Sequence, residues 1–204
     1  MPTRNTPRSR AEKAALTKEA LIAGGIAAIA EDGLDASLDE ICRRAGFTRG
    51  AFYVHFQDRD DLVQAIMERV GRLFLEALFS GGTLATTVSR FVSAVHSGTY
   101  PLTQRGGVKP HQLLDACARS TVVRARYLAL IDQSIGQLAA QARRGQDTDE
   151  VRDDVRADDL ALLLMCVVIG AQTLLELELP LEATKLAGAL MTLIGSRTKP
   201  VRKR

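Results

Sequence analysis

Apolar residues recur every three or four positions along most of the chain, which predicts helices and an all-α protein. No useful length alternates with the period of two that a strand requires. The first expected helix covers 11–32 and is ended by Gly33. Its buried stripe falls on Leu21, Ile22, Ile26 and Ile29. Gly24 and Gly25 lie in the middle of this helix and weaken it, so we expect another helix to cross closely there.

The same periodicity continues after Gly33 and brings the expected total to about nine helices. We expect them at 37–45, 48–56, 58–78, 84–97, 111–144 (one kinked helix or two), 156–176 and 181–194. Prolines and glycines predict a broken segment at 98–110, and charged residues predict a loop at 145–154.

The stretch from Ser37 to Phe56 predicts two short helices joined by a tight turn. Ser37 and Glu40 have the spacing of a capping box, which starts the first helix. Gly46 can take the left-handed conformation that ends it, and Thr48 can cap the second. A helix, a glycine turn and a second helix is the arrangement that places one helix in a DNA major groove.

Two interpretations of this stretch remain open from spacing alone. In the first, Phe52 and Phe56 face inward and the remaining side chains of the second helix face DNA. Arginine can pair with guanine, small apolar groups can meet the thymine methyl, and tyrosine or histidine can bond phosphates. The outward residues are then Arg49, Ala51, Tyr53, Val54 and His55. In the second, the stretch is an ordinary helical hairpin whose aromatic residues all belong to a core.

The stretch resembles the DNA-binding domain of the TetR/AcrR family of bacterial transcriptional regulators. The matching residues are Ile41, Ala45-Gly46-Phe47-Thr48, Gly50-Ala51-Phe52-Tyr53, His55-Phe56 and Leu62, with flanking matches from Thr17 to Met67. Arg59 stands where the family usually has lysine, and the segment from Gly33 to Ile41 is one residue shorter than the commonest family spacing.

The resemblance implies an N-terminal three-helix DNA-binding domain at 11–71, with its helix-turn-helix at 37–56, and a C-terminal helical bundle at 72–196. The bundle would bind a ligand and form the dimer, and basic tails occupy 1–10 and 197–204. The implied protein is a homodimeric repressor that a small-molecule effector releases from a palindromic operator in double-stranded DNA. The expected DNA contacts are Ser37, Thr48, Arg49, Gly50, Ala51, Tyr53, Val54, His55 and Arg59.

Ligand and dimer sites are implied by the resemblance more loosely. Polar residues near the broken segment are the candidates for the effector pocket: His96, Tyr100, His111 and Tyr127. The last two helices are apolar nearly all round, so a subunit interface is one way to bury them, and an internal core helix is the other. The dimer candidates are Leu162, Cys166, Ile169, Leu190 and Leu193.

Charge and cysteine usage fit this picture. The 204-residue chain has a net charge of +3, to which residues 1–13 contribute +3 and residues 197–204 contribute +5, so the remainder is −5. Basic charge at the ends and an acidic body suit a protein with one DNA-facing part. Three cysteines without paired spacing indicate neither disulfides nor zinc, and favour a reducing, cytoplasmic setting. No signal peptide is expected, and the most apolar run, 160–175, is too short to suggest a membrane partner.

No catalytic motif is found. His55 belongs to the recognition motif, and His96 and His111 lie in different elements with no carboxylate or cysteine at ligand spacing. No phosphate-binding loop or nucleophile elbow occurs. We therefore expect no enzyme, no cofactor and no metal. One further alternative, a helical ligand-binding or interaction module with little sequence-specific DNA binding, stays open because the DNA domain carries little basic charge outside its arm.

Overall fold

The computed structural model describes residues 9–33, 36–97 and 109–196, and within them the chain is all-α, as predicted. Nine helices occur in these residues. They are α1 (Arg10–Asp32), α2 (Leu38–Ala45), α3 (Arg49–His55), α4 (Arg59–Phe79), α5 (Leu84–Ser97), α6 (Pro110–Arg119), α7 (Thr121–Asp147), α8 (Ala157–Glu176) and α9 (Ala183–Ile194). The expected helix at 111–144 is two helices that meet at Ser120. Both basic tails, apart from Ser9 and Arg10, lie outside the described residues.

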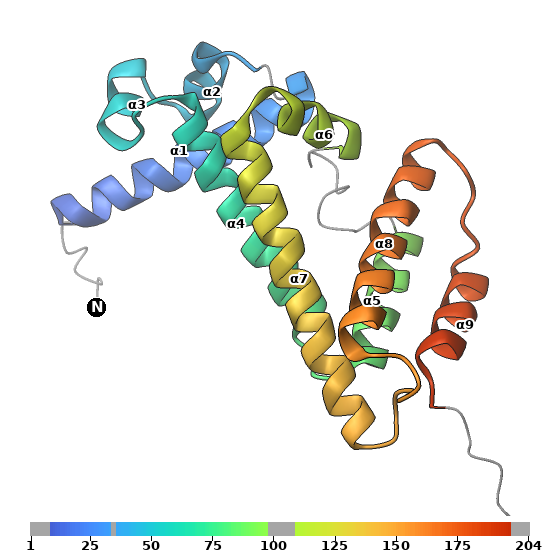
Figure 1. Ribbon diagram of the computed structural model, residues 1–204. Coiled ribbons are helices and arrows are strands. Elements are labelled where there is room, and N and C mark those ends of the chain that lie inside the picture. The colour runs from blue at the N-terminus through green and yellow to red at the C-terminus, as the bar shows by residue number, and fades with distance from the viewer. Residues whose placement is uncertain (1–8, 34–35, 98–108, 197–204) are drawn as a thin grey trace, which may run out of the picture.

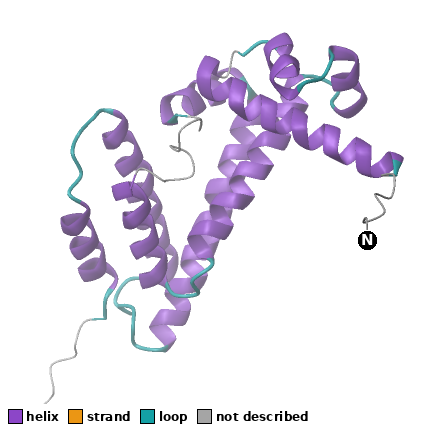
Figure 2. Ribbon diagram, turned by 180° about the vertical axis from the view of Figure 1, so that it is seen from behind, coloured by secondary structure: helices purple, strands orange, loops and turns teal. Residues whose placement is uncertain are grey.

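Two long helices, α4 and α7, pack side by side and connect the two ends of the molecule (Figure 1). Helices α1, α2 and α3 cluster at one end, with α6 beside them. Helices α5, α8 and α9 lie at the other end, where α8 packs on α7 and α9 packs on α5. The view from behind shows the same two groups joined by the central pair (Figure 2).

The helices begin where capping residues stand. Ser9 and Glu12 form a complete capping box at the start of α1, so the helix begins within the last residues of the expected N-terminal basic tail. Asp58 accepts a hydrogen bond from the backbone N–H of Asp61 at 2.9 Å and starts α4. Such caps satisfy N–H groups that the helix itself leaves without acceptors.

The buried side chains form two hydrophobic clusters. The first joins α1, α2, α3 and the first half of α4, and it also includes Leu113, Ala116, Cys117 and Val123 from α6 and the start of α7. The second joins the rest of α4 and α7 to α5, α8 and α9. Only α4 and α7 contribute buried residues to both clusters, among the residues described. The two-domain division at residue 71 remains a proposal, because α6 shares the first cluster.

Helix α8 has two apolar sides, one buried and one exposed. Its inner side, with Leu160, Ala161 and Leu164, is buried in the second cluster. Its outer side leaves Leu162, Leu163 and Ile169 exposed. By length and composition α8 is the one described helix that could cross a membrane, with 33% of its most apolar window buried. The outer side has no cover within the chain's described part.

Gly24 of α1 lies where another helix crosses closely, as the sequence predicts. A Cβ placed on Gly24 would lie 2.8 Å from both the Cβ and the backbone nitrogen of Ala45, because α2 crosses α1 there. We expect Gly24→Ala to lower the free energy of unfolding by about 1–3 kcal/mol, since backbone must move and the helix-propensity gain of about 1 kcal/mol is smaller. The measurement is chemical denaturation.

The control is Gly136→Ala in α7, where a new Cβ meets nothing within 4 Å. Here only the propensity gain of up to about 1 kcal/mol remains, so the protein should become more stable. Equal gains at both positions would contradict the close crossing.

Candidate nucleic-acid interface

The turn between α2 and α3 has the geometry that the sequence predicts. Gly46 adopts a left-handed conformation with φ 74° and ψ 27°, and its N–H donates to the carbonyl of Arg43. Phe47 follows and donates from its N–H to the carbonyl of Cys42 at 2.9 Å. The chain then turns directly into α3, where Thr48 Oγ1 accepts from the N–H of Ala51 at 3.3 Å.

The inner side of α3 is fixed by aromatic packing. Phe52 is completely buried, Phe56 is nearly so, and their ring centroids lie 5.3 Å apart. Lys18 of α1 lies over the Phe56 ring at 5.3 Å from its centroid. These contacts determine which side of the short helix faces outward.

The outer side of α3 carries the predicted DNA-contacting residues. Tyr53 is 58% exposed and Val54 is 77% exposed. Arg49 and Gly50 are also exposed, and Ala51 and His55 are half-buried. The helix therefore presents one contiguous outward surface, at the end of the molecule farthest from α9 (Figure 1).

Ser37 and Thr48 lie at the N-terminal ends of α2 and α3. Each hydroxyl oxygen accepts a backbone N–H three residues on, at 3.2 Å for Ser37 and 3.3 Å for Thr48. A hydroxyl that accepts one bond still has its own O–H to donate. Both side chains are exposed, so both remain available to a phosphate oxygen.

Glu40 does not close the predicted capping box, because two arginines hold its carboxylate. It accepts from Arg43 Nη2 at 2.5 Å and from Arg44 Nε at 2.5 Å. These hydrogen bonds, that from Arg43 first, lower the pKa of Glu40 from 4.5 to about 2. Arg44 also pairs with Glu31 of α1 at 2.7 Å, so the network fastens α2 to α1.

Arg49 forms an ion pair with Asp39 across the turn. Its Nε donates to Asp39 Oδ1 at 2.5 Å and its Nη2 donates to Asp39 Oδ2 at 2.7 Å. The hydrogen bonds that Arg49 donates to Asp39 raise the pKa of Arg49, and the negative charge of Asp39 adds to this effect. Sequence analysis did not single out Asp39, because a spacing of ten residues is not a helical spacing and carries no signal.

Arg59 is placed differently from the other predicted contacts. Its Nε and Nη2 atoms are buried and have no hydrogen-bond partner among the described residues. The side chain lines a cleft between the start of α4 and the junction of α6 and α7, together with Val63, Ser120 and Val123. The phosphate contact predicted for Arg59 is not supported by this position, because those two nitrogens point into the protein.

The four predicted ligand residues do not converge on one site. His96 is exposed on α5, and Tyr100 lies outside the described residues. His111 of α6 pairs with Glu176 of α8 at the surface. Tyr127 is partly buried against the first cluster, where burial raises its pKa.

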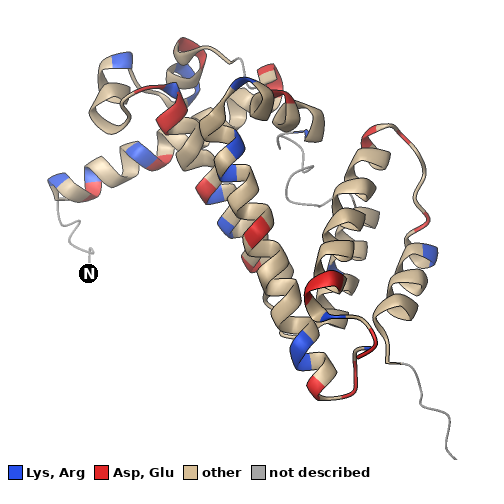
Figure 3. Cartoon of the chain, in the orientation of Figure 1, with Lys and Arg blue, Asp and Glu red and all other residues tan. Residues whose placement is uncertain are grey.

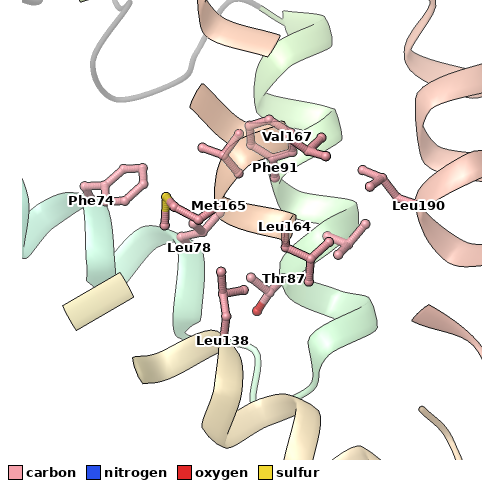
Figure 4. A pocket seen from close by; sticks show the side chains of 11 residues that line it. Phe74, Leu78, Thr87, Phe91, Leu138, Leu164, Met165, Val167 and Leu190 are labelled. Carbon is pink, nitrogen blue, oxygen red and sulfur yellow. The ribbon is translucent and has the colours of Figure 1, made fainter. Parts of the chain in front are cut away.

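A small, mostly apolar cavity lies elsewhere, among α4, α5, α7, α8 and α9. Its volume is about 20 Å³, room for about one water molecule. Its lining includes Phe74, Leu78, Phe91, Leu138, Leu164, Met165 and Leu190, and its one polar lining residue is Thr87 (Figure 4). Thr87 is 2% exposed, and its hydroxyl oxygen has no hydrogen-bond partner within the described chain. Sequence analysis missed this site, because its residues are ordinary core types contributed by five helices.

The predicted dimer residues divide into two groups. Leu162, Cys166 and Ile169 are exposed along the outer side of α8. Leu193 is partly buried, whereas Leu190 is only 4% exposed and points into the cavity of its own subunit. Leu190 is therefore a core residue in this structure. Among the residues described, no three histidine, cysteine or carboxylate side chains gather as a metal site.

The chain is similar in sequence to curated HTH-type transcriptional regulators. Over 61 residues the chain is 38% identical to the uncharacterized HTH-type transcriptional regulator TtgW of Pseudomonas putida, a match that covers 29% of this chain and only 46% of TtgW. Over 189 residues it is 29% identical to the HTH-type transcriptional repressor BepR of Brucella suis, covering 92% of this chain and 81% of BepR.

Solved structures agree with the fold over nearly the whole chain. The TetR-family transcriptional regulator from Cytophaga hutchinsonii has a TM-score of 0.75 at 18% identity, covering 97% of this chain and 100% of that one. The SmeT–triclosan complex has a TM-score of 0.71 at 23% identity, covering 88% and 91%. At these identities the likeness establishes the fold.

A helix-turn-helix with an exposed second helix, set on an all-helical body, defines a DNA-binding transcriptional regulator. Residues 21–66 match the family model described as bacterial regulatory proteins, tetR family. The chain therefore resembles TetR-family regulators in these residues, in its curated relatives and in its fold. The charged residues of the DNA-binding end are of both signs (Figure 3).

The unpartnered hydroxyl of Thr87 has a measurable consequence. A buried polar group without a hydrogen bond costs about 1–3 kcal/mol, so Thr87→Val should raise the free energy of unfolding by about 1 kcal/mol or more. The control is Ser134→Ala, whose buried hydroxyl donates to the carbonyl of Leu130 at 2.8 Å and whose loss should destabilise. Denaturant unfolding of both variants checks this, and a destabilised Thr87→Val would mean that the hydroxyl has a partner.

Proposed function

We propose that this regulator is a homodimeric repressor, and that two copies of α3 enter successive major grooves of a palindromic operator. The observation that carries the proposal is the exposed outer side of α3, held outward by the burial of Phe52 and Phe56. A two-fold symmetric dimer matches a palindromic site when its two reading helices lie about one helical turn of DNA apart, or a multiple of it.

Within each half-site the residues divide by chemistry. Arg49 and Ala51 read base edges, with Tyr53 and Val54 beside them. Ser37, Thr48 and His55 bind phosphates and set the register, and the exposed Gly50 lets the backbone approach closely. Operator binding requires access to the chromosome, so we propose that the protein is cytoplasmic. The free state of its three cysteines suits that compartment.

The outer side of α8 supports the dimer. Leu162, Leu163, Cys166 and Ile169 form an exposed and mostly apolar stripe with helical spacing. A stripe of this kind is stabilised when a second apolar surface covers it. A second copy of α8 provides that surface and also supplies the second reading helix.

A small-molecule effector would act through the cavity between α4 and α8. The SmeT–triclosan complex is a structural neighbour that contains a small molecule. The lining here favours an uncharged, largely apolar compound with one hydrogen-bonding group for Thr87. Because the cavity has a volume of only about 20 Å³, such a ligand has to push helices apart as it enters. Phe74 and Leu78 would transmit that movement to α4.

A second candidate, a helical ligand-binding or interaction module with little sequence-specific DNA binding, is favoured by one observation. Residues 11–71 contain seven Lys and Arg against eleven Asp and Glu, a net of −4. Affinity for DNA that comes from phosphate neutralisation is correspondingly small. The two candidates differ in the ratio of specific to non-specific DNA affinity. This ratio is high for the regulator and close to one for the second candidate.

The decisive experiment measures that ratio. The purified protein is first used to select duplexes from a random pool, and the selected duplex and an unrelated one are then titrated at one fixed salt concentration. We expect a specific affinity at least about 10³-fold above the non-specific one. Arg49→Ala should reduce this ratio about tenfold or more while the dimer stays intact, because the guanine contact is lost. Equal enrichment of all sequences would support the second candidate.

The dimer has its own test. Leu162→Glu places a charge in the α8 stripe, so we expect a dimer-to-monomer change in sedimentation at micromolar concentration. Leu128→Glu on α7 is the matched control, because Leu128 is equally exposed at 55% and lies outside the stripe. Cys166, the one exposed cysteine among the three, should react slowly with a maleimide in the dimer and quickly in Leu162→Glu. A wild-type monomer, or a dimer that survives Leu162→Glu, would overturn this interface.

A further inference from the structure

We infer that Asp39 is a positioning residue for base recognition, which holds one edge of Arg49 so that the opposite edge of the guanidinium faces the DNA. The inference rests on the proposed function, in which α3 enters the major groove. It assigns a role to a residue of α2 that contacts no base. That residue would determine how strongly Arg49 prefers guanine over other bases.

The geometry of the pair leaves the reading edge of Arg49 free. Asp39 accepts from Nε at 2.5 Å and from Nη2 at 2.7 Å, which uses the side edge of the guanidinium. An arginine has five N–H groups in a rigid plane, so two from Nη1 and one from Nη2 remain. One N–H from each of these two nitrogens forms the parallel pair at the end of the side chain. That pair can donate to O6 and N7 of one guanine.

The stability of the fold does not explain this contact. The side chains of Arg49 and Asp39 are 57% and 71% exposed, and exposed ion pairs contribute little to folding. Asp39 belongs to the first turn of α2 and Arg49 is the first residue of α3, so the contact bridges the turn at the surface. Its effect is on the conformation of Arg49, which loses less side-chain freedom on binding a base if it is already held.

The charge of Asp39 sharpens the choice of sequence further. A carboxylate beside the groove is repelled by phosphates, and Arg49 compensates it only while the two stay paired. If Arg49 turns to a phosphate of a wrong site, Asp39 is left next to DNA without its partner. Asp39 therefore weakens binding to wrong sites more than binding to the right one. In a domain whose net charge is already −4, this effect is not hidden by a large excess of basic residues.

The test uses the full-length protein and the duplex that it selects from a random pool. Single base-pair variants of that duplex locate the guanine whose replacement is most harmful, and an unrelated duplex reports non-specific binding. We expect wild type to disfavour replacement of this guanine about tenfold or more. In Asp39→Ala this preference should fall to about threefold or less, while affinity for the unrelated duplex rises. Asp39→Asn, which keeps the shape and loses the charge, should behave similarly.

Two further variants separate the possible causes. In Arg49→Ala the guanine preference is lost, and adding Asp39→Ala to it should cause no additional loss, because the two residues act on the same base. Asp115→Ala removes an exposed carboxylate that pairs with Arg119 on α6, away from both α3 and the α8 stripe, and should leave both affinities unchanged. Thermal unfolding of every variant monitors the stability of α2, where a first-turn aspartate is favourable.

Each alternative outcome has one meaning. If Asp39→Ala keeps the wild-type guanine preference while Arg49→Ala loses it, the proposed function stands and the role of Asp39 is overturned. If Asp39→Ala weakens both duplexes together and lowers the unfolding temperature, Asp39 serves folding and the inference is again overturned. If Arg49→Ala keeps the preference, or wild type has none, the assignment of α3 fails and the inference fails with it.

Discussion

The burial of Phe52 and Phe56 is the interaction on which the DNA-binding end depends. A helix of seven residues is too short to be stable in water by itself, so α3 exists because these rings are buried against its neighbours. The same burial determines which residues face outward. Tyr53 and Val54 are exposed because Phe52 and Phe56 occupy the inner positions of α3. The reading surface is thus a consequence of core packing.

Scarce positive charge constrains how that surface can work. Arg43, Arg44 and Arg69 of the DNA-binding end are paired with carboxylates of the same subunit, and Arg59 has two nitrogens buried. Among the described residues of this end, few cations therefore remain to neutralise phosphates, so under the proposed function they contribute little sequence-independent affinity. Under the proposed function, discrimination between DNA sequences would then depend on how firmly a few donors, such as those of Arg49, are held in place.

Local signals in the sequence were sufficient for the helices and for the turn. Each of these signals involves only a few neighbouring residues: the caps Thr48 and Asp58, the left-handed Gly46 and the helical periodicity. The observed helices follow them closely. The cavity around Thr87, the burial of Arg59 and the entry of α6 into the first cluster were not predictable in this way. They depend on residues that are far apart in the chain and of ordinary type. Glu40 shows the same limit, because its cap spacing was correct but Arg43 and Arg44 hold the carboxylate.

The two hydrophobic clusters explain how an effector could influence DNA binding without touching it. Helix α4 places Leu62 and Ile66 in the cluster that supports α3, and Phe74 and Leu78 in the lining of the cavity. A close-packed helix moves as a body, so a ligand that displaces its far half also shifts its near half. The effect requires only that the ligand bind more tightly to the displaced arrangement than to the present one. Because the cavity around Thr87 has room for only about one water molecule, a larger ligand in it would favour the displaced arrangement.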